Sequence, residues 1–272
     1  MSQTPIGQAK HIRVQHLAEA KSQGHKLVML TAYDQPTAQI FDQAGIELLL
    51  VGDSMGNTML GYQNTLPVSL KQMAVAVSAV AAGARRALVV ADLPFGTYES
   101  GPARCLDSAV KLLKAGAHAV KFEGGRRVAK QIELLSQSGI PVMAHLGFTP
   151  QSINLLGGSR VQGRDAATAE QLKAEALSVQ KAGAFALVLE MVPAKLATDI
   201  TNQLSIPTIG IGAGSGTDGQ VLVWTDMAGV SDWVPSFVRK FGDLRGALTT
   251  AATDYAAAVR SGTYPDQGHS FQ

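Results

Sequence analysis

The sequence has a single cysteine, Cys105, in 272 residues. One thiol excludes an internal disulfide framework and any metal or redox site built from paired cysteines. Charged residues are also sparse, at 16% of the chain, and the 23 basic side chains nearly balance the 21 acidic ones. The net charge of +2 leaves no strong electrostatic field, so we expect neither nucleic acid nor an anionic membrane as a partner.

Long apolar runs are missing as well. No stretch approaches the roughly 20 apolar residues that span a bilayer. The segment 1–26 is polar and lacks the apolar core of a secretion signal, so we expect a cytoplasmic protein. The apolar content of 46% excludes a disordered chain. The low charge content suggests that other subunits cover part of the surface.

What the sequence does contain is a repeated unit, in which a helical stretch ends in a glycine and a short apolar run follows. Glycine is the residue expected just past a helix end, and near-continuous apolar runs are typical of parallel strands covered on both faces. Five glycines close such stretches: Gly45, Gly83, Gly116, Gly139 and Gly183. Eight runs are predicted as strands: 27–32, 47–51, 87–90, 119–122, 141–144, 186–189, 207–212 and, most weakly marked, 220–223.

This alternation predicts a parallel α/β fold, and its even spacing favours a closed (β/α)8 TIM barrel over a doubly wound sheet. We see no linker or low-complexity tract, so we expect one domain over residues 1–272. The stretch Ile12 to Ser22 is predicted to be an extra helix that closes the barrel floor. The Ala-rich stretch Asp243 to Arg260 is predicted to be a long terminal helix.

Polar residues follow or end most of the predicted strands. In such a barrel the carboxyl ends of all strands meet at one mouth, where function resides. Asp53, Asp92 and Glu123 would then converge, and buried carboxylates are costly unless they are paired or bound to a cation. Carboxylates without a cluster of His or Cys suit Mg²⁺ better than Zn²⁺. The pattern therefore predicts a magnesium site.

Three more mouth residues complete a possible site for enolisation beside a carbonyl. Lys121 lies two positions from Glu123, so both side chains point to the same side of their strand. Its ammonium would bind a substrate carboxylate or phosphate and, with the metal, stabilise an enolate oxygen. Glu190 or His145 could take the proton.

Each residue also has a plain structural interpretation. Asp53 and Asp92 could be helix N-caps, Lys121 could pair with Glu123, and His145 could be a structural histidine. Glu190 could cap a helix that starts near Pro193. The joint occurrence of these side chains at five strand ends favours the functional interpretation.

Other functions compete with this one. Residues 52–56, Gly-Asp-Ser-Met-Gly, match the nucleophile elbow of serine hydrolases, with Ser54 as nucleophile. Against it, the stretch Asn57 to Pro67 is predicted to be a loop, whereas the elbow needs a helix directly after the serine. A metal-dependent lyase on the same barrel and a non-catalytic metabolite-binding protein stay open as further alternatives.

Eight segments follow one another along the chain as distinctive motifs: TAYD at 31–34, VGDSMG at 51–56, TLPV at 65–68, ADLPF at 91–95, VKFEGG at 120–125, HLGFTPQS at 145–152, LEMVP at 189–193 and GIGAG at 210–214. In this order they closely resemble ketopantoate hydroxymethyltransferases. The likeness extends from about Leu27 to the tail segment 264–271.

The resemblance implies a barrel of the phosphoenolpyruvate/pyruvate superfamily. It implies transfer of a one-carbon unit from 5,10-methylenetetrahydrofolate to 3-methyl-2-oxobutanoate, on the way to pantothenate. It also implies a cytoplasmic homo-oligomer, usually a decamer. By the same carry-over, the residue roles are Mg²⁺ ligation by Asp53, Asp92 and Glu123, substrate binding by Asp53, Ser54, Asp92, Lys121 and His145, and proton abstraction by Glu190.

Overall fold

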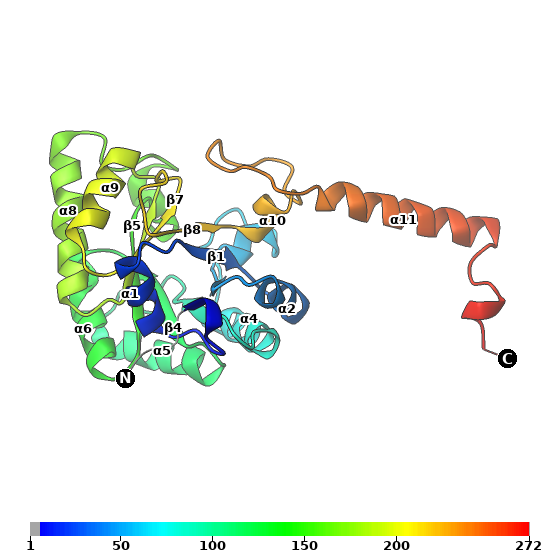
Figure 1. Ribbon diagram of the computed structural model, residues 1–272, viewed down its shortest axis with the longest axis horizontal. Helices are drawn as coiled ribbons and strands as arrows, with labels where there is room; N and C mark the ends of the chain where they lie inside the picture. Colours follow the sequence, from blue (N-terminus) through cyan, green and yellow to red (C-terminus); the bar gives the residue numbers. More distant parts are fainter. Residues whose placement is uncertain (1–5, 272) are drawn as a thin grey trace. The chain divides into compact units, whose positions relative to one another are not determined.

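The computed structural model describes residues 6–271 and shows a closed parallel barrel (Figure 1). Two compact units make up the chain: the first ends at Leu222 and contains the whole barrel, and the second begins at Val223. The strands are β1 (Leu27–Thr31), β2 (Leu48–Val51), β3 (Leu88–Asp92), β4 (Ala119–Glu123), β5 (Val142–Gly147), β6 (Ala186–Glu190), β7 (Thr208–Ile211) and β8 (Gly219–Leu222).

Helices alternate with these strands and cover the outside of the barrel (Figure 1). The α-helices are α1 (Val14–Ser22), α2 (Gln35–Gln43), α3 (Met55–Thr58), α4 (Leu70–Gly83), α5 (Pro102–Lys114), α6 (Ala129–Gln137), α7 (Ile153–Leu156), α8 (Ala166–Lys181) and α9 (Ala194–Gln203). Three 3₁₀ turns, η1 (Ile6–Gln8), η2 (Arg126–Val128) and η3 (Pro150–Ser152), complete the unit.

Each strand pairs in parallel with the next, and β8 returns to β1 to close the ring. The predicted barrel is therefore confirmed, including the short eighth strand. Strands β2 to β4 are buried along their whole length, as near-continuous apolar runs require when side chains fill the interior and helices cover the outside. None of the helices between residues 6 and 271 combines the length and apolar character needed to cross a membrane.

The five glycines predicted to end helices have two different structural roles. Gly45, Gly116, Gly139 and Gly183 have positive φ, as expected of residues that end a helix in the left-handed region. Gly83 does not: it is the last residue of α4, and a Cβ there would overlap the backbone of α2 at Gln35. Its role is close helix packing.

The N-terminal segment closes the floor of the barrel, as predicted. Ile6, Ile12 and Leu17 belong to the same buried core as the first residues of the strands, such as Leu27 and Leu88. The guanidinium of Arg86 donates to the carbonyls of residues 6 and 9 and so ties this segment to the start of β3. The mouth of the barrel is therefore left for polar side chains.

The second unit contains α10 (Trp224–Met227), α11 (Leu244–Ser261) and the 3₁₀ turn η4 (Gln267–His269). Helix α11 confirms the predicted terminal helix, and Asp243 caps it by accepting from the amide of Gly246 at 3.0 Å. No residue of α11 is buried. Because the barrel is complete at Leu222, the expectation of one domain over the whole chain stays a prediction.

Leu17 tests the role of the floor. It is fully buried, so Leu17→Ala should lower the free energy of unfolding by about 2–5 kcal/mol through lost burial and a residual cavity. Leu155→Ala is the matched control, because Leu155 is 88% exposed and should change stability little. Denaturant unfolding followed by circular dichroism measures both. Equal stability of the two variants would contradict the packing described here.

Candidate active site

Six ionisable residues predicted at the strand ends converge at the mouth of the barrel. Strand register places Asp92 of β3 beside Lys121 of β4, and Glu123 of β4 beside His145 of β5. Asp53 follows β2 directly, and Glu190 ends β6. Five of these side chains are buried, whereas that of Glu190 is 18% exposed. The predicted convergence is therefore confirmed.

Lys121 and Asp92 form a buried ion pair, with 2.7 Å between Lys121 Nζ and Asp92 Oδ1. Burial alone would lower the pKa of Lys121, but the charges of Asp92, Asp53 and Glu123 raise it above its ordinary value. The ammonium therefore stays protonated at neutral pH. Its partner is Asp92 rather than Glu123, so the expected alternative of a Lys121–Glu123 salt bridge is wrong.

The remaining acids are held as hydrogen-bond acceptors. Asp53 donates its amide to Asp92 Oδ2 at 3.1 Å, and its own carboxylate accepts from the Gln151 side chain at 2.8 Å. Burial, followed by repulsion from Asp92, raises the pKa of Asp53 to about 7. Burial and the charge of Asp53 also raise the pKa of Glu123 well above its usual value. Ionisation of all the carboxylates at the mouth is therefore unfavourable in the absence of additional positive charge.

His145 links the lysine to the acid at the rim. Its Nε2 lies 3.2 Å from Glu190 Oε2, and its Nδ1 lies 3.5 Å from Lys121 Nζ. Burial and the nearby Lys121 charge lower the pKa of His145, so the ring is neutral at pH 7. The tautomer that suits both neighbours carries its proton on Nε2 and accepts at Nδ1. His145 can therefore orient the Glu190 carboxylate.

The backbone around Glu190 is tightly constrained. Met191 follows it with φ of 49°, a left-handed conformation that is rare for a residue with a side chain. The Glu190 carbonyl accepts from the amide of Phe148 at 2.8 Å, and a Cβ on Gly147 would overlap that carbonyl. Helix α9 starts after Pro193 without a side-chain cap, so Glu190 is not the N-cap that the alternative interpretation allowed.

Ser54 lacks the surroundings of a serine nucleophile. Its hydroxyl lies 2.8 Å from the hydroxyl of Tyr33, and burial raises the pKa of Tyr33, so the phenol stays neutral. His145 faces Glu190 and Lys121 instead. The loop predicted over Asn57 to Pro67 needs correction at its start, because Asn57 and Thr58 belong to the four-residue helix α3, after which residues 59–67 are irregular. One turn of helix without a neighbouring base does not make a hydrolase site.

The acids are compatible with a divalent cation but do not form a ready cage. Within residues 6–271, no three or more His, Cys, Asp and Glu side chains lie in an arrangement that could hold a metal ion. Asp53, Asp92 and Glu123 each contact a protein donor instead. Their chemistry still fits Mg²⁺, which usually takes one or two carboxylates and completes its shell with water or substrate oxygens.

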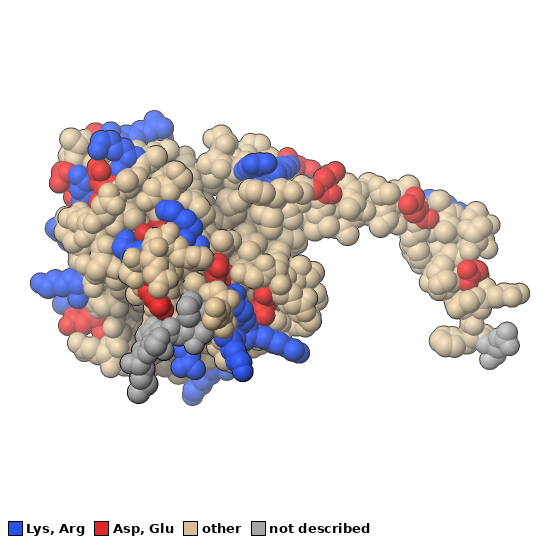
Figure 2. All heavy atoms as spheres, viewed as in Figure 1, with Lys and Arg blue, Asp and Glu red and all other residues tan. Residues whose placement is uncertain are grey.

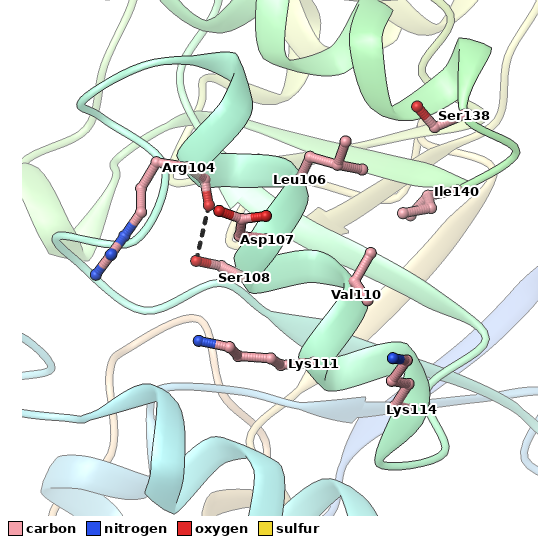
Figure 3. Close-up of a pocket in the computed structure, with 9 residues that line it drawn as sticks. All are labelled: Arg104, Leu106, Asp107, Ser108, Val110, Lys111, Lys114, Ser138 and Ile140. Carbon is pink, nitrogen blue, oxygen red and sulfur yellow. Dashed lines mark hydrogen bonds between the residues drawn. The ribbon is translucent and has the colours of Figure 1, made fainter.

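Two further buried residues belong to this network and were not predicted as site residues, although Gln151 lies within the matching segment 145–152. Gln151 of η3 contacts two of the acids, and the hydroxyl of Tyr98 donates to the Gln151 side chain. A separate surface hollow of about 640 Å³ runs along α5 (Figure 3). Its basic residues, Arg104, Lys111 and Lys114, are not part of the mouth.

Solved structures with this fold include a phosphonopyruvate hydrolase in complex with oxalate and Mg²⁺. Its TM-score is 0.62 at 13% identity, and the match covers 94% of this chain and 92% of that one. A 2,3-dimethylmalate lyase of the PEP mutase/isocitrate lyase superfamily has a TM-score of 0.59 at 16% identity, covering 93% and 90%. At this identity the likeness establishes the fold alone, and it agrees with the expected superfamily of barrels.

Sequence relatives are much closer. The 3-methyl-2-oxobutanoate hydroxymethyltransferase of Mycolicibacterium paratuberculosis is 59% identical over 262 residues, which cover 96% of this chain and 92% of that protein. The protein of the same name from Mycobacterium tuberculosis H37Rv is 57% identical over 267 residues, covering 97% and 95%. The family model described as ketopantoate hydroxymethyltransferase matches residues 11–267. With its barrel and its buried acids in place, the chain belongs to the ketopantoate hydroxymethyltransferase family of enzymes.

Proposed function

We propose that this enzyme transfers a hydroxymethyl group from 5,10-methylenetetrahydrofolate to 3-methyl-2-oxobutanoate, giving 2-dehydropantoate for pantothenate synthesis. Family membership supports the substrate and the product. The observation that carries the mechanism is the chain of contacts at the mouth, from Asp92 through Lys121 and His145 to Glu190. It joins a fixed positive charge to a carboxylate that reaches the rim.

Substrate binding follows from these charges. A 2-oxo acid is an anion with two adjacent oxygen functions, and the protonated Lys121 gives it a buried positive charge. Ser54 lies beside Asp53 and adds a hydroxyl that can donate to a carboxylate. We propose that Asp53, Ser54, Asp92, Lys121 and His145 together contact the substrate.

Glu190 is proposed as the base. The C3 hydrogen of the substrate is acidified by the neighbouring ketone, and a carboxylate at the rim can remove it. The electron pair of the C3–H bond then forms the C2–C3 double bond, and negative charge develops on the keto oxygen near Lys121. Water releases the one-carbon unit from the folate at the oxidation level of formaldehyde and leaves tetrahydrofolate. C3 then attacks the carbon of this unit, and its oxygen, which comes from water, takes up the proton removed from C3 and becomes the hydroxyl. His145 holds Glu190 during proton removal because its neutral ring faces the carboxylate.

We propose Mg²⁺ as the metal, with Asp53, Asp92 and Glu123 as its ligands. Their hard oxygen donors and the raised pKa of Asp53 support this proposal, because a cation would relieve the repulsion among these acids. When bound, the ion would polarise the keto oxygen as a Lewis acid. One protein with the same fold, a phosphonopyruvate hydrolase, was solved with Mg²⁺ and oxalate, which is a two-carbon diacid. This pairing of a metal with a small diacid is consistent with Mg²⁺ as the metal.

We also propose a cytoplasmic homo-oligomer, a decamer by family resemblance. Helix α11 supports self-association because Leu244, Leu248, Tyr255 and Val259 are 37–61% exposed and share one side of the helix. The space-filling view shows charges of both signs interspersed on the barrel and wide uncharged areas between them (Figure 2). Such areas suit burial against further copies of the chain.

Glu190→Gln tests the base. The amide keeps the shape of the side chain but cannot accept a proton, so exchange of the C3 hydrogen of 3-methyl-2-oxobutanoate in D₂O should fall by at least about 100-fold. Proton NMR follows the exchange without folate. Substrate binding should persist. Glu133→Gln, on the exposed face of α6, is the control and should exchange normally. Unchanged exchange in Glu190→Gln would place the base elsewhere.

Asp92→Asn tests the metal site. The loss of one charged ligand should weaken Mn²⁺ binding, measured by electron paramagnetic resonance, by at least about 100-fold, because even outer partners of metal sites contribute roughly 10- to 100-fold. Metal-dependent exchange should disappear as well. Asp107→Asn on α5 is the matched control (Figure 3). Full exchange activity of the wild-type protein after chelation would remove the metal from the mechanism.

Leu248→Glu tests the exposed side of α11. A charge in the apolar stripe should reduce the mass of the assembly, measured by size-exclusion chromatography with light scattering. Thr250→Glu is the control, because it places the same charge on the opposite side of the helix, where Thr250 is exposed. A Leu248→Glu variant that keeps the wild-type mass would exclude this stripe from the contacts between copies.

A further inference from the structure

We propose that Gln151, oriented by Tyr98, is a positioning residue that holds two of the mouth carboxylates, Asp53 and Glu123, in a fixed position relative to each other and so supports the binding of a divalent cation between the strands. This inference rests on the proposed metal site, but it concerns residues that do not themselves offer a ligand to the ion. The inference is based on the hydrogen bonds that Gln151 makes.

Gln151 donates hydrogen bonds to both acids, one from its side chain and one from its main chain. Its side-chain amide, at Nε2, donates to Asp53 Oδ2 at 2.8 Å, and its main-chain amide donates to Glu123 Oε2 at 3.0 Å. The residue is only 5% exposed. One residue of the loop after β5 therefore joins the carboxylate that follows β2 to the carboxylate that ends β4. A shift of Gln151 would move both.

The orientation of the side-chain amide is fixed by its other partners. Tyr98 donates its hydroxyl to Gln151 Oε1 at 2.7 Å, which identifies the oxygen end of the amide. The second Nε2 hydrogen goes to the carbonyl of Leu93 at 3.0 Å. Both hydrogens and the oxygen are used, so a flipped amide would leave buried polar atoms unpaired. The donor end is therefore held toward Asp53.

Tyr98 is itself anchored. It is 1% exposed, and its ring packs against Phe122, the residue between Lys121 and Glu123, with 5.1 Å between ring centroids. The chain of contacts thus runs from a packed aromatic pair to Gln151 and on to the acids.

These contacts leave the acids able to act as ligands. Gln151 engages one oxygen of each carboxylate, Asp53 Oδ2 and Glu123 Oε2, and its own oxygen faces Tyr98. Outer hydrogen bonds of this kind orient ligands and usually change metal affinity by roughly 10- to 100-fold. A residue that only filled space would influence stability but not metal affinity.

The test measures binding of Mn²⁺ alone by electron paramagnetic resonance in the absence of substrate. Gln151→Leu should weaken binding by about 10- to 100-fold, and Tyr98→Phe, which removes only the orienting hydroxyl, by about 3- to 10-fold. In C3 exchange, saturating Mn²⁺ should restore the exchange rate of Tyr98→Phe. Gln131→Leu is the matched control: Gln131 is equally buried and contacts Tyr98 but neither acid, so its variant should bind Mn²⁺ like the wild type.

The outcomes separate this inference from the proposed function. A wild-type protein that binds Mn²⁺ and exchanges C3 hydrogen, with unchanged affinity in Gln151→Leu, overturns the positioning role and leaves the function standing. If Gln151→Leu does not fold, unchanged affinity in Tyr98→Phe overturns it in the same way. A wild-type protein that binds no Mn²⁺ overturns the metal site and the positioning role together. If Gln131→Leu weakens Mn²⁺ binding as much as Gln151→Leu does, the effect comes from packing, and the positioning role of Gln151 is overturned.

Discussion

The ion pair between Lys121 and Asp92 is the interaction on which the mouth of the barrel depends. Both partners are buried. Removal of one charge would leave the other buried without a partner, and the free-energy cost of that exceeds the net stabilisation that the pair provides. The pair also sets the protonation of its neighbours. Lys121 stays charged because acids surround it, and burial together with the Lys121 charge lowers the pKa of His145, so that its ring is neutral. The charged ammonium of Lys121 and the neutral ring of His145 are thereby fixed next to each other.

The barrel itself creates this arrangement. Parallel register places residues of neighbouring strands at equal height, so Asp92 meets Lys121 and Glu123 meets His145 without any flexible loop. Stability is supplied at the opposite end, where Leu17 and its neighbours fill the floor. The separation allows the mouth to keep acids whose charges repel one another, because the remaining core supports the strands that carry them.

Much of this could be predicted from the sequence, for physical reasons. Buried parallel strands need apolar runs, so all eight strands were recognisable, and even residues 220–223 coincide with β8 to within one residue. Acids at strand ends predicted the shared mouth. The partner of Lys121 was not predictable from its own strand, since Asp92 lies on the neighbouring one. Gln151 lies in a matching segment, but its role was not predictable, because a glutamine in a loop has no periodicity and acquires its contacts only after folding.

Met191 has a consequence for redesign of the enzyme. Its left-handed backbone, together with the close approach of Gly147 to the Glu190 carbonyl, means that the main chain sets the reach of the proposed base. Rotamer adjustment of surrounding side chains would not relocate it. Substitutions meant to admit bulkier keto acids would therefore be made at side chains across the mouth, such as Ser54 and Tyr33, and not in the segment that fixes Glu190.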